Sequence, residues 1–220
     1  MAASGTTDFD LEIDQVVDEA FDRCGVEMRT GRDLRSAARS LNLMFAQWAN
    51  KGINRWKIKQ TTLTLVQGQQ DYTLGADTID ILSAALRRDN TDYSMYRLSQ
   101  DEWLSLPNKN TQARPIQFYV DRQIIPILRV WFKPDNSTDI IVYDRLVRVE
   151  DAGAFTNTAD LPFRFLEPMV AGLAYYLSVK YSPDRTTLLK AMYDECMLEA
   201  QHEDRDRASF RVAPFMGRGR

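Results

Sequence analysis

The spacing of the apolar residues changes twice along this 220-residue chain, and that change most limits what the chain can fold into. Up to Gly52, and again after about residue 160, apolar residues recur every three to four positions, as they do on one face of an α-helix. Between these parts, residues 53–150 form short alternating runs rich in β-branched and aromatic residues, which are typical of strands. The pattern therefore predicts an α+β chain in which a β-rich segment interrupts a helical one.

Four helices are expected in the helical parts. The first two cover residues 10–24 and 30–51, and each ends at a glycine, the residue that most easily adopts the left-handed conformation beyond a helix. The third begins near Pro168, and a fourth follows the capping sequence of residues 182–184. The apolar stripe of the fourth helix, which we expect to face a core, comprises Leu188, Leu189, Met192 and Cys196.

Turn residues divide the β-rich segment into strands. The alternating residues 56–65 indicate a first strand, and further strands are expected near residues 71–74, 79–87, 93–98, 116–121, 124–132 and 140–149. In the first strand, Trp56 and Ile58 alternate in one parity and Leu63 and Leu65 in the other, which predicts a bulge near Thr61.

Three local signals refine this segment. Residues 67–70 have the composition of a hairpin turn, and Pro126 marks its strand as an edge strand or a strand start. The Ser-x-x-Glu capping box of residues 99–102 predicts a short helix that Pro107 ends.

The expected architecture is a four-helix bundle core with an inserted β-rich domain and an extended C-terminal helix and tail. Residues 1–52 and 161–208 would form the bundle, residues 53–160 the inserted domain, and residues 209–220 a docking tail.

Charge and motif content exclude several classes of function. The 28 basic and 31 acidic residues leave a net charge of −3, which argues against a protein that coats nucleic acid. The sequence has no Gly-rich phosphate-binding motif, so no nucleotide cofactor is expected. His202 is the only histidine and Cys24 and Cys196 lie far apart, so we predict no metal site. The longest apolar stretch, residues 169–179, is too short to span a membrane.

The C-terminal tail combines apolar anchors with arginines, the residue types that dominate the buried centres of protein interfaces. The residues expected to dock onto a partner are Phe210, Arg211, Val212, Phe215, Met216, Arg218 and Arg220. A frayed terminus would leave these apolar side chains in water. The acidic N-terminal helix could also join the Arg-rich tail of an identical neighbour in a heterologous contact.

A second candidate interaction site is the polar run of residues 106–115, which is longer than a sheet connection needs. Its candidate contact residues are Asn108, Lys109, Gln112 and Arg114. A simple connector is the alternative interpretation of this run. An enzymatic alternative, a cell-wall (peptidoglycan) hydrolase, would use acids of the first segment such as Asp8, Asp10 and Glu12. Such acids are more often a solvated helix face, and no catalytic residue is assigned.

Several segments in the same order and spacing are similar to the head-to-tail adaptor proteins of short-tailed bacteriophages, also called tail accessory or head completion factors. The segments that carry the resemblance are residues 68–74, 97–99, 106–109, 111–112, 114–115, 121–123, 161–165, 172–177 and 203–205. The resemblance covers most of the chain beyond Leu41.

The resemblance implies a virion protein at the head-to-tail junction that is assembled in the host cytoplasm. It implies a homo-oligomeric ring, usually of twelve copies, that lies under the portal protein, extends the DNA channel and gives tail (nozzle or fiber) proteins a surface for attachment. It also implies that the C-terminal segment reaches the portal. DNA would pass without sequence-specific binding, and no reaction, cofactor or membrane contact is expected.

Overall fold

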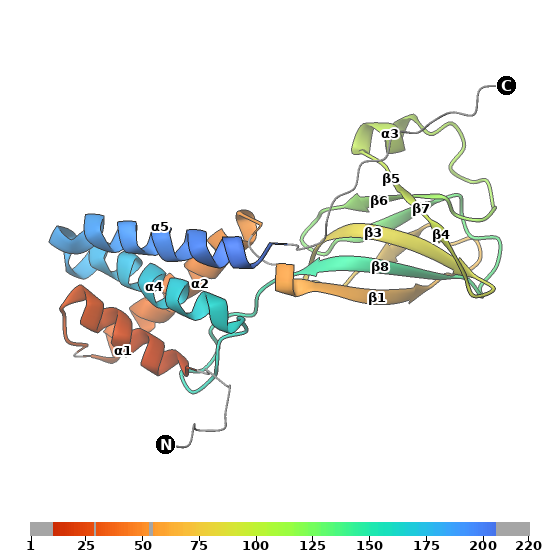
Figure 1. Cartoon of the computed structure of the whole chain (residues 1–220). Coiled ribbons are helices and arrows are strands. Elements are labelled where there is room, and N and C mark those ends of the chain that lie inside the picture. Colours follow the sequence, from red (N-terminus) through yellow and green to blue (C-terminus); the bar gives the residue numbers. More distant parts are fainter. Residues whose placement is uncertain (1–10, 29, 53–54, 206–220) are drawn as a thin grey trace, which may run out of the picture. The chain divides into compact units, whose positions relative to one another are not determined.

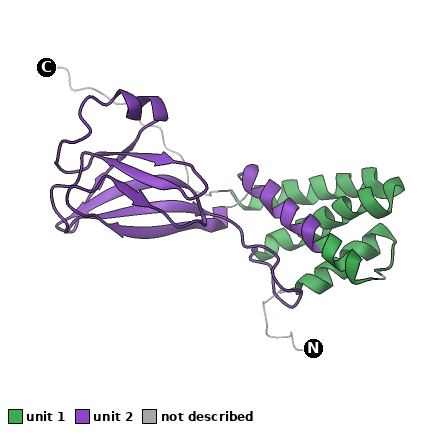
Figure 2. Cartoon of the chain, turned by 180° about the vertical axis from the view of Figure 1, so that it is seen from behind, with its two compact units in different colours: residues 1–37, 162–220 green, residues 38–161 purple. Residues whose placement is uncertain are grey.

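The computed structural model describes residues 11–28, 30–52 and 55–205 of the chain. These residues form five α-helices and two four-stranded sheets, so the α+β class is confirmed (Figure 1). The chain divides into two compact units, one drawn from residues 1–37 and 162–220 and the other from residues 38–161 (Figure 2). Helix α2, Gly31–Asn50, belongs to both units because the division falls within it. The four-helix bundle and its domain limits therefore stay predictions.

In the helical unit, α1 (Ile13–Cys24) and α5 (Thr186–Glu203) both pack on α4 (Leu166–Tyr181). Helix α4 has apolar residues all round, and its Leu173, Ala174 and Leu177 are fully buried, as befits a central helix. Short 3-10 turns precede α4 and α5, at Phe163–Phe165 and Pro183–Arg185. Pro162 precedes the first of these turns and Pro183 begins the second, which suits the fixed backbone of proline.

The first turns of α2 are tied to the end of α4 by polar contacts within the helical unit. The Tyr181 hydroxyl donates to the Asp33 carboxylate at 3.1 Å, and the Lys180 ammonium donates to the Ser36 hydroxyl at 3.1 Å. Asp33 also accepts a hydrogen bond from the backbone N–H of Thr30, at 3.1 Å. These contacts fix where α2 begins.

The expected apolar stripe of α5 is confirmed at Leu189 and wrong at Leu188 and Met192. The buried residues are Leu189, Tyr193, Met197 and Ala200. Leu188 is 62% exposed and Met192 is 38% exposed. Neighbouring helix positions differ by about 100° around the axis, so two adjacent leucines cannot both face one core. The Tyr193 ring, stacked on Tyr175 with centroids 6.2 Å apart, fixes which face turns inward.

The β unit is built from two sheets. In strand order, the first sheet consists of β1 (Ile58–Thr64), β8 (Ile140–Val147), β3 (Thr78–Arg88) and β4 (Thr91–Ser94). The second consists of β2 (Asp71–Thr73), β7 (Ile127–Trp131), β6 (Gln117–Asp121) and β5 (Tyr96–Arg97). Only the β5 and β6 pair is parallel among these strands. A 3-10 turn at Arg55–Lys57 precedes β1, and the short helix α3 (Gln100–Ser105) lies between β5 and β6.

One apolar core joins the two sheets face to face. Its buried residues come from both sheets and their connections: Leu65, Tyr72, Leu74, Ile81, Ala84, Leu86, Met95, Phe118, Val120, Leu128, Val130, Ile141 and Tyr143. In β6 and β7 these residues alternate with half-buried ones, which is the period-2 pattern of a strand with one face in a core. The Tyr72 hydroxyl, at the edge of this core, accepts from the Val66 N–H at 3.0 Å and donates to the Gln69 carbonyl at 3.1 Å. Burial raises the pKa of that phenol, which keeps its donor proton.

Two expectations for this unit are wrong. Strand β1 pairs with β8 in unbroken register, and the irregularities lie instead in β3, between Thr78 and Asp80 and between Ile81 and Ser83. The apparent change of parity has no bulge behind it: Trp56 belongs to the 3-10 turn, and Ile58, the first residue of β1, is exposed, whereas Leu63 packs against the core. Residues 67–70 do not form a hairpin, because β1 pairs with β8 while β2 pairs with β7 in the other sheet.

Other local predictions are confirmed. Strand β7 begins at Ile127, directly after Pro126, and lies inside its sheet, so Pro126 marks a strand start and not an edge. The predicted capping box is formed: the Glu102 N–H donates to the Ser99 hydroxyl at 3.3 Å, and the Ser99 N–H donates to the Glu102 carboxylate at 2.7 Å. That backbone hydrogen bond lowers the pKa of Glu102.

Candidate functional site

The polar loop of residues 106–115 leaves α3 and leads to β6, and Trp103 of α3 forms its base. Trp103 is buried and stacks on Tyr119 of β6, with ring centroids 5.8 Å apart. The Lys109 ammonium lies 5.8 Å from the centroid of the Trp103 ring and donates to the Leu104 carbonyl at 3.3 Å. The start of the loop is therefore held against the short helix.

The middle of the loop is tied to β7 and to the turn before β2. The Trp131 indole N–H donates to the Asn108 carbonyl at 3.0 Å, and the Gln70 side-chain amide donates to the Lys109 carbonyl at 3.3 Å. The Asn108 side chain accepts from the Asn110 N–H at 3.0 Å, which closes a local turn. These contacts give the loop a defined shape although it contains no strand of its own.

The end of the loop is tied to the segment after β7 and to β4. Gln112 forms an isolated parallel bridge with Lys133, and the Lys133 N–H donates to the Thr111 carbonyl at 3.1 Å. The Arg114 guanidinium lies over the Tyr93 ring, 4.1 Å from its centroid. The four predicted contact residues thus lie on one anchored loop, with Asn108 and Gln112 exposed and Lys109 and Arg114 half-buried.

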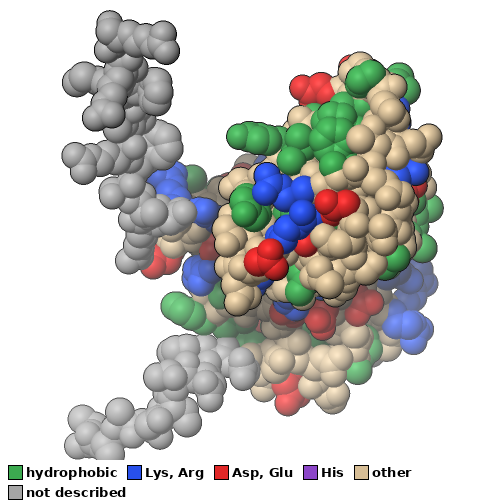
Figure 3. Space-filling model, turned by 90° about the vertical axis from the view of Figure 1, so that its right-hand side faces the viewer, with side chains coloured by type: hydrophobic (Ala, Val, Ile, Leu, Met, Phe, Trp, Pro, Cys, Tyr) green, Lys and Arg blue, Asp and Glu red, His purple; other side chains and the backbone are tan. Residues whose placement is uncertain are grey.

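The same region exposes apolar side chains that the sequence analysis did not single out. Leu104 is 75% exposed and Tyr96 is 71% exposed. The exposure of Leu104 could have been predicted from the sequence of α3. A helix of six residues that buries Trp103 must turn the neighbouring Leu104 toward solvent. The end of the β unit drawn in Figure 3 carries basic side chains beside acidic ones, with hydrophobic side chains toward its upper part. Mixed polar and apolar surface of this kind suits a protein partner.

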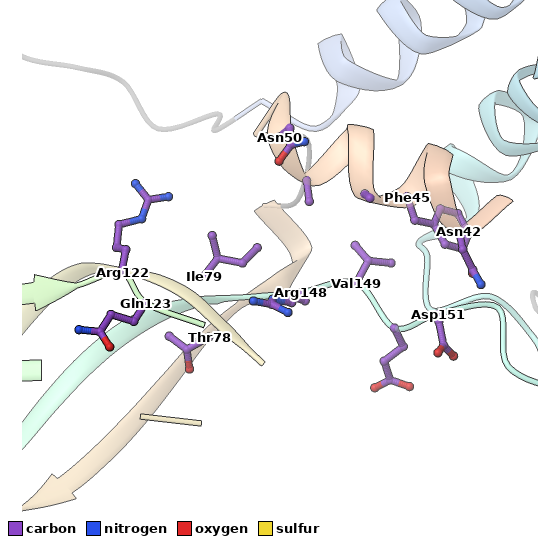
Figure 4. Close-up of a pocket in the computed structure, with 13 residues that line it drawn as sticks. Asn42, Phe45, Asn50, Thr78, Ile79, Arg122, Gln123, Arg148, Val149 and Asp151 are labelled. Atoms are coloured by element: carbon purple, nitrogen blue, oxygen red, sulfur yellow. The ribbon is translucent and has the colours of Figure 1, made fainter. Parts of the chain in front are cut away.

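A pocket of about 570 Å³ lies elsewhere in the unit of residues 38–161 (Figure 4). It is lined by the second half of α2, the start of β3, the turn between β6 and β7, and the segment that follows β8. Its charged lining residues are Arg122, Arg148, Glu150 and Asp151. None of the residues predicted for the interaction loop lines this pocket.

Glu12 and Glu19, two of the carboxylates at α1 that the structure describes, make local contacts. Glu12 precedes the first turn of α1, and its N–H donates to the Gln15 side chain at 3.2 Å. Glu19 and Glu167 line a groove of about 650 Å³ beside α1, where both accept hydrogen bonds from Arg23, at 2.9 and 2.6 Å. Arg23 therefore links α1 to α4 through Glu167, while its pair with Glu19 lies within α1. Asp8 and Asp10 lie outside the described residues.

The predicted docking tail also lies outside the described residues, which end at Arg205. This applies to Phe210, Arg211, Val212, Phe215, Met216, Arg218 and Arg220. The point from which the tail departs is described: the Arg164 guanidinium, just before α4, donates to Asp204 at 3.0 Å. Asp204 is 9% exposed in its side chain, so the end of α5 is fixed to the helical unit.

Among the residues that the structure describes, no three His, Cys, Asp or Glu side chains are grouped so that they could hold a metal ion. No helix in this part of the chain has the length and apolarity needed to cross a bilayer.

The anchored polar loop with exposed apolar neighbours has the mixed composition that protein-binding surfaces favour. Comparison with protein families agrees with a protein-binding role. Residues 13–215 match the model of the SU10 adaptor protein family, and the chain belongs to this family. It is therefore a phage structural adaptor and a component of the virion. A comparison with curated proteins finds no match.

Proposed function

We propose that this chain is a non-enzymatic head-to-tail adaptor that forms a ring under the portal of a short-tailed phage. The ring, of twelve copies by resemblance, extends the DNA channel at the head-to-tail junction and receives the nozzle or fiber proteins of the tail. The subunits are made and assembled in the host cytoplasm. Family membership and the anchored loop of residues 106–115 support this proposal, because an adaptor needs a surface that is shaped before its partner arrives.

In this proposal the loop contacts a tail component or the neighbouring subunit. Asn108 and Gln112 offer amide donors and acceptors, whereas Lys109 and Arg114 offer cations already oriented by Trp103 and Tyr93. A loop whose backbone is fixed by intrachain hydrogen bonds loses little conformational entropy on binding. The exposed Leu104 adds apolar area beside these polar groups.

The C-terminal tail docks onto the portal in the same proposal. Its departure point is fixed by the contact between Arg164 and Asp204, so every subunit presents the tail from the same place. Phe210 and Phe215 are the apolar anchors, and the arginines at 211, 218 and 220 supply charge. A net charge of −3 suits the lining of a DNA channel, because few phosphate contacts would hold the duplex in place.

Removing the tail is expected to abolish binding to the portal. We would compare the full-length protein with a chain that ends at Ala208 for cosedimentation with the purified portal ring. The full-length protein should sediment with the portal, whereas the shortened chain should stay in the supernatant because it lacks all seven docking residues.

The folded units provide the internal control for this comparison. The deletion begins beyond Glu203, where α5 ends, so the two chains should give the same circular dichroism spectrum and the same unfolding midpoint. A variant with Asn108→Ala and Gln112→Ala tests the other surface and should still bind the portal. Equal portal binding by the full-length and shortened chains would contradict a docking role for the tail.

A further inference from the structure

Helix α1 carries a row of acidic side chains on its outer side. The row consists of Asp14, Asp18 and Asp22, and we call it the acidic row. A spacing of four residues places these aspartates on one side of a helix, and eight residues of rise span roughly 12 Å. Buried residues of α1, among them Val16 and Ala20, lie on the opposite side of the helix. Asp18 and Asp22 are exposed and Asp14 is half-buried.

Helix α2 carries a matching row of basic side chains. The row consists of Arg32, Arg35 and Arg39, all exposed, and we call it the basic row. Their spacing of three and four residues also places them on one side of a helix, and seven residues of rise span roughly 10 Å. The buried Leu41 and Met44 lie away from this side. Leu43, 66% exposed, extends the basic row by one turn with an apolar side chain.

The charges of the two rows are not paired within the described part of the chain, although Asp14 accepts a hydrogen bond from the Gln15 N–H at 2.7 Å. Within the part of the chain that the structure describes, none of these six side chains forms an ion pair. This contrasts with the other charges of α1, since Glu19 is bound to Arg23. Three like charges along one helix repel one another mildly, so each row is a surface that gains from an opposite charge.

We infer that the acidic row of one copy docks against the basic row of the next copy in the ring. The inference rests on the proposed function, because it names the contact between subunits that a ring requires. The two rows have opposite sign, the same number of charges and nearly the same length. Because both rows are on the same chain, each copy gives its acidic row to one neighbour and its basic row to the other, which is the heterologous contact that closes a ring.

The charged rows set orientation and register, and exposed ion pairs such as these contribute little energy individually. Leu43 and similar apolar side chains supply area that becomes buried. The acids of α5 are a less suitable partner for the basic row. Glu195 and Glu199 share their helix surface with the exposed apolar side chains of Leu188 and Met192, so α5 offers no uninterrupted acidic row.

Reversing the charge of one row should weaken assembly. We would prepare one full-length variant with Asp18→Arg and Asp22→Arg, and a second with Arg32→Glu and Arg35→Glu. Neither change opposes the helix dipole, because arginines near the end of α1 and a glutamate at the start of α2 are favourable positions. Mass photometry with and without the portal measures the protein concentration at which rings form. For each variant this concentration should be at least about tenfold higher than for the wild type.

Mixing the two variants should restore assembly. One variant is basic on both helices and the other is acidic on both, so they can alternate around a ring, whereas two misfolded chains could not rescue each other. A control variant with Glu195→Arg and Glu199→Arg on α5 should assemble like the wild type. The inference is overturned if the single variants assemble normally, if the mixture does not, or if the α5 control fails in the same way. A wild-type chain that forms no ring, alone or on the portal, would instead refute the proposed function.

Discussion

Replacing Arg88 with methionine should lower the free energy of unfolding of the β unit by about 3 kcal/mol. Arg88, at the end of β3, binds Asp139 through its Nε at 2.9 Å and also binds Asp135. The Asp139 side chain is 1% exposed, so removal of the guanidinium would leave a buried carboxylate without its counter-charge. Urea unfolding at pH 7, followed by the fluorescence of Trp103 and Trp131 in this unit, measures the change.

Arg87 provides a matched control one residue away on the same strand. It pairs with Asp92 at 2.7 Å, but the two side chains are 43% and 47% exposed, so water can solvate Asp92 when its partner is lost. Arg87→Met should leave the urea midpoint nearly unchanged. Equal losses for the two variants would show that burial of Asp139 does not govern the effect.

Replacing Leu189 with alanine should lower the stability of the helical unit by about 3 kcal/mol. Leu189 is 4% exposed and lies on the inner side of α5 with Tyr193 and Met197. Its truncation removes apolar contacts and leaves a cavity against the neighbouring helices. Thermal unfolding followed by circular dichroism at 222 nm measures the loss of helix.

The neighbouring Leu188 is 62% exposed, so Leu188→Ala should shift the unfolding transition very little. The pair tests the orientation of α5 directly, since both residues are leucines and they are adjacent in the helix. A larger loss for Leu188→Ala than for Leu189→Ala would mean that the other side of α5 faces the core.

The comparison of these leucines shows what periodicity can and cannot determine. The pattern of residues 182–203 was enough to predict a helix, because several registers of an apolar stripe all have a helical period. It could not choose among registers, because Leu188, Leu189 and Met192 are all apolar. Tyr193, whose ring stacks on Tyr175, decides the register through a contact that exists only in the folded unit.

The turn at residues 67–70 is a second example. Its glycine, Gly68, has a φ of +76°, as the turn composition implies. The same composition suits a hairpin and a crossing between two sheets, and only the pairing of β1 with β8 and β2 with β7 distinguishes them. By contrast, the capping box at Ser99 depends on neighbours three residues apart, and the sequence predicted it fully.

The candidate surfaces were predictable to different degrees. The loop of residues 106–115 was found from its length, but its anchoring by Trp131 and Tyr93 depends on strands far away in the sequence. For contacts between subunits, the sequence analysis paired the acidic first helix with the C-terminal arginines. The basic row of α2 was missed because its spacing of three and four residues becomes a surface only when the opposite side of the helix is seen to be buried.

The central claim, that this adaptor forms a ring on the portal, is tested most directly by the mass of the complex. We would add excess full-length protein to the purified portal ring, separate the complex by gel filtration and determine its mass by native mass spectrometry. The account predicts one discrete species that exceeds the portal mass by twelve subunits of 25.3 kDa. A portal whose mass is unchanged in the presence of excess protein would contradict the account.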